Sequence, residues 1–317
     1  MHGGVAMTDC VYICSAGHSG STLLDLLIGA HSRAVSLGEI THLPKNLALN
    51  TQCSCGEPVR SCEIWADVVA DINQKLGVDL IANPYKLNLG LFKAQVVVDN
   101  AHQTKWRLFW QNIVRAFWYL ELRYGLSLLP GLTAEAKRGV ENNFMLYDVV
   151  GSVRGADKVV DSSKSYFKAA QLYKMRPDKV KIILLVRDGR AVLFSAIKKG
   201  VKRRVRLAAW HGLYQRALPV LRRNVDSTDI LRVRYEDLAN EPELELTRIC
   251  KFVGLEYEPA MLSFNEKDHH VTNGNDMRLG RGSAIKIDDS WKSSIAPYDL
   301  AYFEHRAGAL NRALGYD

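Results

Sequence analysis

Short apolar runs recur along the chain, and most of them are followed by residues with helical spacing. The first run, Cys10–Ser15 (CVYICS), precedes Thr22–Ile28, whose apolar residues recur at the period of a helix. Runs of this kind predict strands at Val11–Ser15, Val35–Ser36, Lys158–Asp161, Lys181–Val186 and Ile230–Arg234. Alternation of strands and helices predicts an α/β fold with a P-loop-like central parallel sheet flanked by helices.

Residues 60–140 interrupt this alternation and have mostly helical patterns, with breaks at Asn83–Pro84 and Pro130–Gly131. The segment predicts a mainly helical cap inserted into the α/β unit. A chain of 317 residues is long enough to bury a large core, and an α/β domain of this size need not be divided. We therefore expect one domain over residues 1–317.

The composition, with 47% hydrophobic and 24% charged residues, is ordinary for a globular protein and excludes a largely disordered chain. The formal charge of +8 indicates an anionic partner. A nucleotide, a nucleic acid and a membrane surface would all suit that charge, so the motifs must decide between them.

The N-terminus lacks the basic start and apolar core of a signal peptide. No apolar stretch reaches the roughly 18–20 residues of a membrane span, because the nearest candidate, Trp106–Leu132, is broken by charged residues. We expect a cytoplasmic protein without a transmembrane segment.

The loop Gly17–Thr22 (GHSGST) lies between a predicted strand and a predicted helix. Its backbone amides, the positive end of the helix dipole and the hydroxyls of Ser19, Ser21 and Thr22 are suited to an oxyanion. A nucleoside-triphosphate P-loop has a lysine after its last glycine, whereas Ser21 follows Gly20 directly here. The loop predicts a phosphate site of a different nucleotide class.

A second phosphate signature, Val186–Arg190 (VRDGR), follows the predicted strand Lys181–Val186. Arg187 offers a planar fork to a phosphate, and Ser195 adds a hydroxyl from a helix that begins near Gly189. Ligands of open parallel sheets bind outside the carboxyl ends of the strands. The two signatures together predict one nucleotide that carries two separate phosphate groups.

At these residues the chain resembles the PAPS-dependent sulfotransferases, with a closer likeness to the tyrosylprotein sulfotransferases and their bacterial relatives. Their donor, 3′-phosphoadenosine 5′-phosphosulfate, carries a 5′-phosphosulfate and a separate 3′-phosphate. The resemblance leaves residues 50–145 without a matching motif. It rests on His18–Thr22, on Gly38–Glu39, on Val186–Ala191 with Ser195, on Arg234–Leu238, and on Asn275–Gly282 with Trp291–Lys292.

The resemblance implies that PAPS is the donor and PAP (3′,5′-ADP) the product. No metal is expected, because cationic side chains and loop amides take the part that magnesium plays for triphosphates. Ser19–Thr22 would hold the 5′-phosphate, Arg187 and Ser195 the 3′-phosphate, and Tyr235 would border the adenine. The implied donor-binding residues are Gly17, His18, Ser19, Gly20, Ser21, Thr22, Arg187, Ser195, Tyr235, Arg278, Arg281, Gly282, Ser283 and Lys292.

The same resemblance implies that Glu39 is the general base for an acceptor hydroxyl, with a helix-capping surface glutamate as the alternative. Lys164 and His18 would meet the charge that develops on the leaving phosphate. The family has lysine or arginine where this chain has His18. A histidine carries full charge only below its reference pKa of about 6.5, unless bound phosphates retain the proton.

Other functions stay open on the sequence alone. A P-loop kinase-like phosphotransferase would need a loop lysine and carboxylates for magnesium, and a non-catalytic nucleotide-binding module would have no use for Glu39. The expected partner is a hydroxyl-bearing acceptor, such as a carbohydrate, a natural product or a tyrosine-like phenol, and not a nucleic acid. The oligomeric state is not predicted.

Two further stretches have alternative interpretations. The basic run Lys198–Arg206 is typical of a solvated helix face, although its position just after Ser195 makes Lys199 a candidate phosphate contact. The aromatic stretch Trp106–Tyr124 is typical of core residues, with an acceptor wall or a peripheral membrane contact as alternatives.

The chain has six cysteines, of which Cys53, Cys55 and Cys62 form a cluster. Three ligands with C-x-C-x6-C spacing and no evident fourth are a weak match to a zinc site. A disulfide from Cys62 to Cys53 or Cys55 is a second interpretation. Free thiols are the default expectation.

Overall fold

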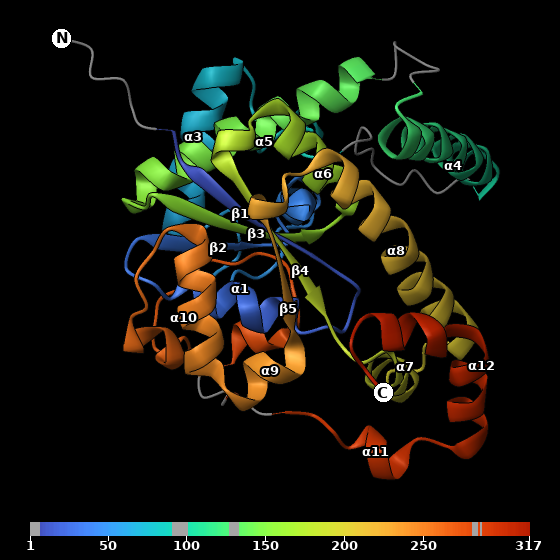
Figure 1. Cartoon of the computed structure of the whole chain (residues 1–317). Helices are drawn as coiled ribbons and strands as arrows, with labels where there is room; N and C mark the ends of the chain where they lie inside the picture. The colour runs from blue at the N-terminus through green and yellow to red at the C-terminus, as the bar shows by residue number, and fades with distance from the viewer. Residues whose placement is uncertain (1–6, 91–100, 127–132, 281–284, 286) are drawn as a thin grey trace.

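The computed structural model of the chain describes residues 7–90, 101–126, 133–280, 285 and 287–317 (Figure 1). Five parallel strands form its central sheet in the order β2-β3-β1-β4-β5. Each strand contains one of the predicted segments, so the strand predictions and the α/β class are confirmed. The strands are β1 (Asp9–Ser15), β2 (Ala34–Gly38), β3 (Lys158–Lys164), β4 (Val180–Val186) and β5 (Ile230–Arg234).

Helices cover both faces of the sheet because its inner strands are apolar on both faces, as is typical of parallel sheets. On β1, Tyr12 and Cys14 point into one core, while Val11 and Ile13 point into the other. The first core is closed by α3 (Glu63–Leu76), α5 (Thr133–Arg154), α6 (Tyr166–Met175) and α8 (Arg203–Asn224). The second is closed by α1 (Ser21–Gly29), α9 (Tyr235–Asn240) and α10 (Pro242–Val253).

The segment predicted as a helical cap is mainly helical where the structure describes it, with mostly turns and coil over residues 77–90, and Pro130–Gly131 lies outside the described residues. Its helix α3 contributes Trp65 to the core under the sheet. Helix α4 (Ala101–Tyr124) instead lies at the periphery, where Leu122 is buried and its carbonyl accepts a hydrogen bond from Asn224 of α8 (Figure 1). Among the described residues of this segment, α4 therefore lies furthest from the sheet (Figure 1).

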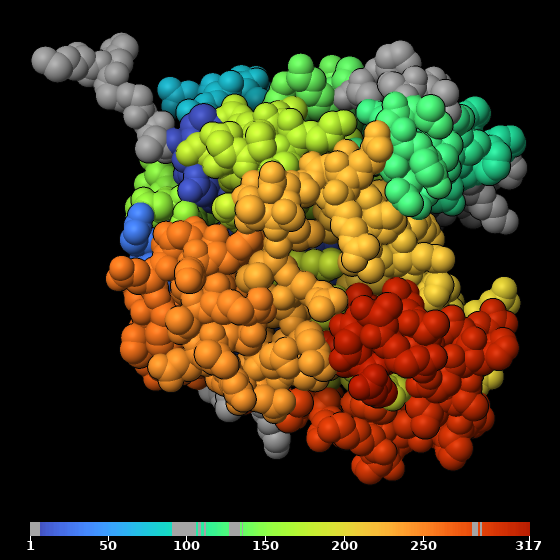
Figure 2. Space-filling view, in the orientation of Figure 1, coloured from blue at the N-terminus to red at the C-terminus, as the bar shows by residue number. Residues whose placement is uncertain are grey.

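The remaining α-helices are α2 (Leu43–Leu49), α7 (Gly189–Lys198), α11 (Trp291–Ser294) and α12 (Pro297–Ala313). Of these, α7 and α12 pack against α8, α11 packs against α7, and α2 lies apart from them, after β2. Figure 2 shows the C-terminal residues in red against the orange segment that contains α9. Tyr316 donates a hydrogen bond of 2.6 Å to the carboxylate of Glu236 there. Among the described helices, none is long and apolar enough to cross a membrane.

Candidate active site

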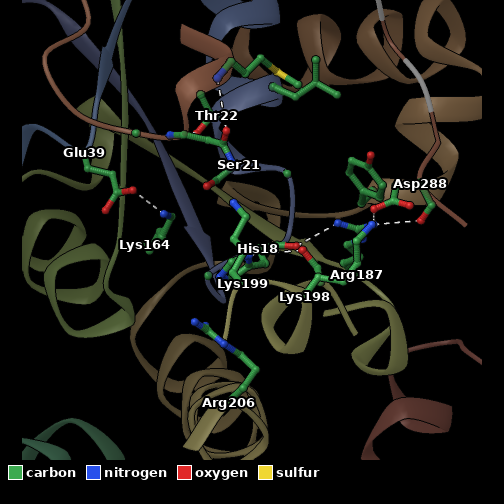
Figure 3. Close-up of a pocket in the computed structure, with 18 residues that line it drawn as sticks. His18, Ser21, Thr22, Glu39, Lys164, Arg187, Lys198, Lys199, Arg206 and Asp288 are labelled. Carbon is green, nitrogen blue, oxygen red and sulfur yellow. Dashed lines mark hydrogen bonds and ion pairs between the residues drawn. The ribbon is translucent and has the colours of Figure 1, made fainter. Parts of the chain in front are cut away.

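A cavity of about 670 Å³ opens at the carboxyl edge of the sheet (Figure 3). Residues at or just after the end of every strand line it, because parallel strands bring their carboxyl ends to one edge. The strand order places these residues along the edge in the sequence Glu39 (after β2), Lys164 (end of β3), Gly17–Thr22 (after β1), Arg187 (after β4) and Tyr235 (after β5).

The loop after β1 has the backbone of an anion site. Gly20 has φ +86 and immediately precedes α1, whose first turn contains no acidic residue. A Cβ at position 20 would lie 2.3 Å from the Tyr235 ring, so glycine is required by both conformation and space. His18 has φ 67, a conformation that few non-glycine residues adopt and that is found often at functional sites. The loop amides and the positive helix end are thus held at the cavity.

The three loop hydroxyls have different positions. Ser21 and Thr22 line the cavity, and Thr22 Oγ1 accepts a hydrogen bond of 3.1 Å from the amide of Asn275. Ser19 is fully buried and its side chain is not among those that line the cavity. The Ser19 hydroxyl therefore does not line the cavity, and its role in phosphate binding stays a prediction.

His18 lies among positive charges. Burial, followed by the charges of Arg206 and Lys199, lowers the pKa of His18 to about 4. Its Nδ1 is 3.4 Å from the hydroxyl of Ser195, which also lines the cavity. The imidazole is therefore neutral at neutral pH, and an anion beside it would favour its charged form.

Glu39 and Lys164 form an ion pair at one end of the cavity, with 2.5 Å between Nζ and Oε1 (Figure 3). Both side chains are largely buried, and His42 Nε2 lies 3.7 Å from the other carboxylate oxygen of Glu39. Lys164 has φ 71, and the register between β1 and β3 shifts just before it. Such bulges re-aim side chains beside functional sites.

A buried network supports this ion pair. Lys168 Nζ lies 2.9 Å from Asp161 Oδ2 on β3, and 2.9 Å from the hydroxyl of Thr41, two residues after Glu39. Thr41 in turn donates to Ser163 Oγ at 2.9 Å. These bonds join the end of β3 to the turn that follows β2, so they fix the two elements that carry Lys164 and Glu39.

Arg187 occupies the opposite end of the cavity. Its guanidinium lies 4.3 Å from the centre of the Tyr235 ring and donates to the carbonyls of His18 (3.1 Å) and Asp288 (3.0 Å). The Asp288 carboxylate is 3.8 Å away. Among the residues that the structure describes, the buried Nε of Arg187 has no hydrogen-bond partner. Arg187 therefore keeps donor capacity for an anion.

The basic run after Ser195 is divided between the two interpretations made from the sequence. Lys198, Lys199 and Arg206 line the cavity, and burial lowers the pKa of Arg206. Arg203 instead pairs with Asp299 at 3.0 Å, away from the cavity lining. Three further cations thus add to Lys164 and Arg187 around one space.

The predicted C-terminal loop lines the cavity, but not with the residues expected from the sequence. Arg278 does not line the cavity, because its guanidinium donates at 3.0 Å to the carbonyls of Gln52 and Val271. Lys292 is exposed and lies 3.5 Å from Asp289. Gly274, Asn275 and Met277 line the cavity instead, and Asp288, which carries no sequence signal, joins them. Arg281, Gly282 and Ser283 lie outside the described residues.

The aromatic stretch is split along α4. Trp118 is buried, as a core residue would be, whereas Trp106, Phe109, Trp110 and Tyr124 each have more than half of their surface exposed. None of these side chains lines the cavity described above.

Curated sulfotransferases match parts of the chain. Protein-tyrosine sulfotransferase A of Caenorhabditis elegans is 24% identical over 200 residues, which are 59% of this chain and 52% of the relative. Carbohydrate sulfotransferase 4 of Mus musculus is 30% identical over 91 residues, or 27% of this chain and 23% of the relative. The chain thus spans about half the length, or less, of these curated relatives.

A solved structure shares the fold. The sulfotransferase domain from the Synechococcus PCC 7002 olefin synthase superposes with a TM-score of 0.52 at 21% identity. The match covers 100% of this chain and 98% of that domain. Residues 10–259 also match the profile of the sulfotransferase family. With the family profile matched over most of its length, the chain belongs to the sulfotransferase family.

Proposed function

We propose that the chain transfers the sulfuryl group of PAPS to a hydroxyl group of an acceptor. The observation that carries this proposal is the order of groups along one cavity. A carboxylate stands at one end, an anion-binding loop in the middle, and an arginine with donor capacity at the other end. PAPS has the matching order of a transferable sulfuryl group, a 5′-phosphate and a 3′-phosphate.

The order gives each group a role. The loop amides with Ser21 and Thr22 bind the 5′-phosphate, so the sulfuryl group faces Glu39 and Lys164. Arg187 binds the 3′-phosphate, and Tyr235 packs beside the adenosine. Lys198, Lys199 and Arg206 supply positive charge between these positions.

The proposed transfer is a single displacement. The acceptor oxygen forms a bond to sulfur, and Glu39 takes the hydroxyl proton as general base. The bond between sulfur and the 5′-phosphate oxygen breaks, and its electron pair stays on that oxygen to give PAP. Lys164, His18 and the loop amides meet the charge that grows there.

The cavity is unsuited to the magnesium chemistry of kinases. No lysine follows Gly20 in the loop. The acidic residues that line the cavity, Glu39 and Asp288, stand at opposite ends, and each lies beside a cation. In the described part of the chain, the cavity therefore lacks a pair of carboxylates that would hold a metal ion against triphosphate oxygens.

The acceptor is a carbohydrate, a natural product or a tyrosine-like phenol. Glu39 selects only for a hydroxyl whose proton it can take, so the base does not distinguish these classes. An acceptor panel with radiolabelled PAPS would assign the class by product formation.

The donor is tested by thermal melting of the protein with 3′,5′-ADP, with 5′-AMP, and with ATP and magnesium. A ligand at 100 times its dissociation constant stabilises the native state by about 2.7 kcal/mol. We expect strong stabilisation by 3′,5′-ADP and little by 5′-AMP, because only the first ligand engages Arg187 and its neighbours. Preferential stabilisation by ATP with magnesium would assign the chain to the kinases. No response to any nucleotide would indicate a module without a donor site.

A further inference from the structure

A second cluster of reactive side chains lies outside the donor cavity. The thiols of Cys53, Cys55 and Cys62 meet the imidazole of His270, and their ligand atoms all lie within 4.8 Å of one another. None of the four lines the donor cavity. The fourth ligand that the cysteine spacing lacks is thus supplied by a residue 208 positions after Cys62.

We propose that these four residues bind one zinc ion in a structural site. Three thiolates and one imidazole are an established ligand set for tetrahedral structural zinc. Bonds of about 2.3 Å from zinc to sulfur place two sulfur atoms about 3.8 Å apart in a tetrahedron. The four ligand atoms already lie within 4.8 Å of one another, and His270 Nδ1 is 3.2 Å from Cys62 Sγ, so small side-chain shifts bring them to zinc-binding distances.

A hydrogen bond to the far ring nitrogen of His270 orients the imidazole as a metal ligand. Its Nε2 lies 3.0 Å from a carboxylate oxygen of Asp268, which accepts the ring proton. That hydrogen bond leaves the lone pair of Nδ1 directed at the thiols. A carboxylate bound to the far nitrogen is the usual partner of a zinc-binding histidine.

The backbone around the cysteines forms a closed turn. Gly56 donates its amide to the carbonyl of Cys53 at 3.0 Å, and Cys53 donates to the carbonyl of Glu57 at 2.8 Å. Gly56 has φ +99, with nothing within 4 Å of the position that a Cβ would take. Glycine is therefore required there by conformation, not by space. The turn brings the thiols of Cys53 and Cys55 to the same side, facing Cys62 at the start of α3.

Zinc accounts for more of this cluster than a disulfide does. A bond between Cys62 and either of the other cysteines would use two of the four groups. It would leave the third thiol and the oriented Nδ1 of His270 without a role. Cys53 and Cys62 are also almost completely buried, at 0% and 1% exposure, so their convergence is a feature of the interior.

The proposed zinc would hold one wall of the donor cavity. The segment that carries His270 is also bound to the cysteine turn by Ser54, whose amide donates to the Val271 carbonyl at 3.0 Å. A few residues later the same segment contacts the donor site. The carbonyl of Asn273 accepts from the Glu39 amide at 3.4 Å, and Asn275 donates to Thr22. Zinc would therefore position the wall without touching the reacting groups.

Metal analysis of the full chain, purified without chelator, tests the site directly. We expect about one zinc per chain by inductively coupled plasma mass spectrometry, and a large loss in the Cys55→Ser and His270→Ala variants. Cys250→Ala is the matched control, because Cys250 is buried away from the cluster, and it should keep its zinc. Asp268→Ala should weaken zinc binding about tenfold in chelator competition, since it removes only the outer partner of His270.

Thiol mapping of the wild-type chain tests the zinc site even if a cysteine variant fails to fold. Mass spectrometry after alkylation, with and without reductant, counts free thiols and disulfides. A chain that lacks zinc and does not take up Zn²⁺ or Co²⁺ would overturn the proposal, whether its cysteines are free or form a disulfide. Stoichiometric content of another metal would overturn the assignment to zinc. These measurements use no donor, so their failure would leave the proposed function standing.

The effect on the donor cavity has its own readout, which rests on the proposed function. Removal of zinc by a chelator should raise the dissociation constant for 3′,5′-ADP several-fold, and added Zn²⁺ should restore it. Unchanged affinity in a folded, zinc-free chain would show that the metal does not support the cavity wall.

Discussion

The ammonium of Lys164 contacts the carboxylate of Glu39 across the gap between β3 and β2, which are neighbouring strands of the sheet. The pair orients the carboxylate towards the space beside the phosphate loop. It also joins the proposed general base to the cation proposed to stabilise the leaving phosphate. The proposed base and one proposed cation of the leaving-group site are therefore in contact before any donor binds.

Replacement of Glu39 by glutamine should lower kcat by about 10²–10⁴-fold, because the amide cannot take the acceptor proton. The dissociation constant for 3′,5′-ADP should change little, since Glu39 lies at the sulfuryl end. Steady-state kinetics and nucleotide titration measure the two effects separately. Glu243→Gln is a control at an exposed position on α10. An unchanged kcat in Glu39→Gln would assign the proton to another group.

His18 should take up a proton when the nucleotide binds. Its pKa of about 4 makes the imidazole neutral in the free protein at pH 7, and phosphate oxygens beside it favour the charged form. A ligand that favours the protonated form binds more weakly as pH rises above the free pKa and towards the bound one. The dissociation constant for 3′,5′-ADP should thus rise with pH, and this rise should flatten in His18→Arg.

Calorimetry in two buffers of different ionisation enthalpy would count that proton. The nucleotide phosphates titrate in the same range, with a pKa of about 6, so the difference between wild type and His18→Arg is the relevant quantity. Identical proton uptake in the two proteins would remove His18 from the charge-stabilising role.

Replacement of Arg187 by lysine should abolish most of the preference for 3′,5′-ADP over 5′-AMP. Lysine keeps a positive charge but loses the planar fork and the contact with the Tyr235 ring. A charge-assisted hydrogen bond contributes about 1.5–3 kcal/mol, which corresponds to roughly 10- to 150-fold in affinity. Titration with both nucleotides would measure it, with the exposed Arg222→Lys as control. Equal losses for the two nucleotides would place Arg187 away from the 3′-phosphate.

Neutralising Asp288 should strengthen the binding of 3′,5′-ADP, in contrast to the Arg187→Lys change. Its carboxylate lies 3.8 Å from the Arg187 guanidinium and would repel a phosphate bound there. Because the Asp288 side chain is half exposed, we expect Asp288→Asn to tighten 3′,5′-ADP only about two- to fivefold. The gain should shrink at high salt, where exposed charges are screened. Weaker binding in the variant would instead indicate that Asp288 contacts the nucleoside.

The strand ends were predictable because their signals are local. An apolar run followed by a loop and a helical pattern places Arg187 and the glycine loop at one edge, whichever helices pack outside. The position of the Arg278 side chain was not predictable, because no local sequence pattern shows that its guanidinium would contact the carbonyls of Gln52 and Val271. His270 could not be linked to the cysteine cluster for the same reason, since only the tertiary fold brings it to Cys62.

The position of the Lys199 side chain was also not predictable from the sequence, for a different reason. A basic residue at the end of a helix has the same pattern whether it faces solvent or a cavity, and the difference depends on how α7 and α8 meet. The structure places Lys199 on the cavity and Arg203 against Asp299. The proposed contacts with the 5′-phosphate and the 3′-phosphate stay predictions.

The close contact between Gly20 and the Tyr235 ring joins the phosphate loop to the residue proposed to border the adenine. A side chain at position 20 would displace the ring, and the ring in turn packs on Arg187. A side chain at position 20 would therefore disturb the proposed binding of the base and of both phosphates together. The acceptor side, reached through Glu39 and Lys164, shares none of these contacts, so a new acceptor could be accommodated while the same donor is retained.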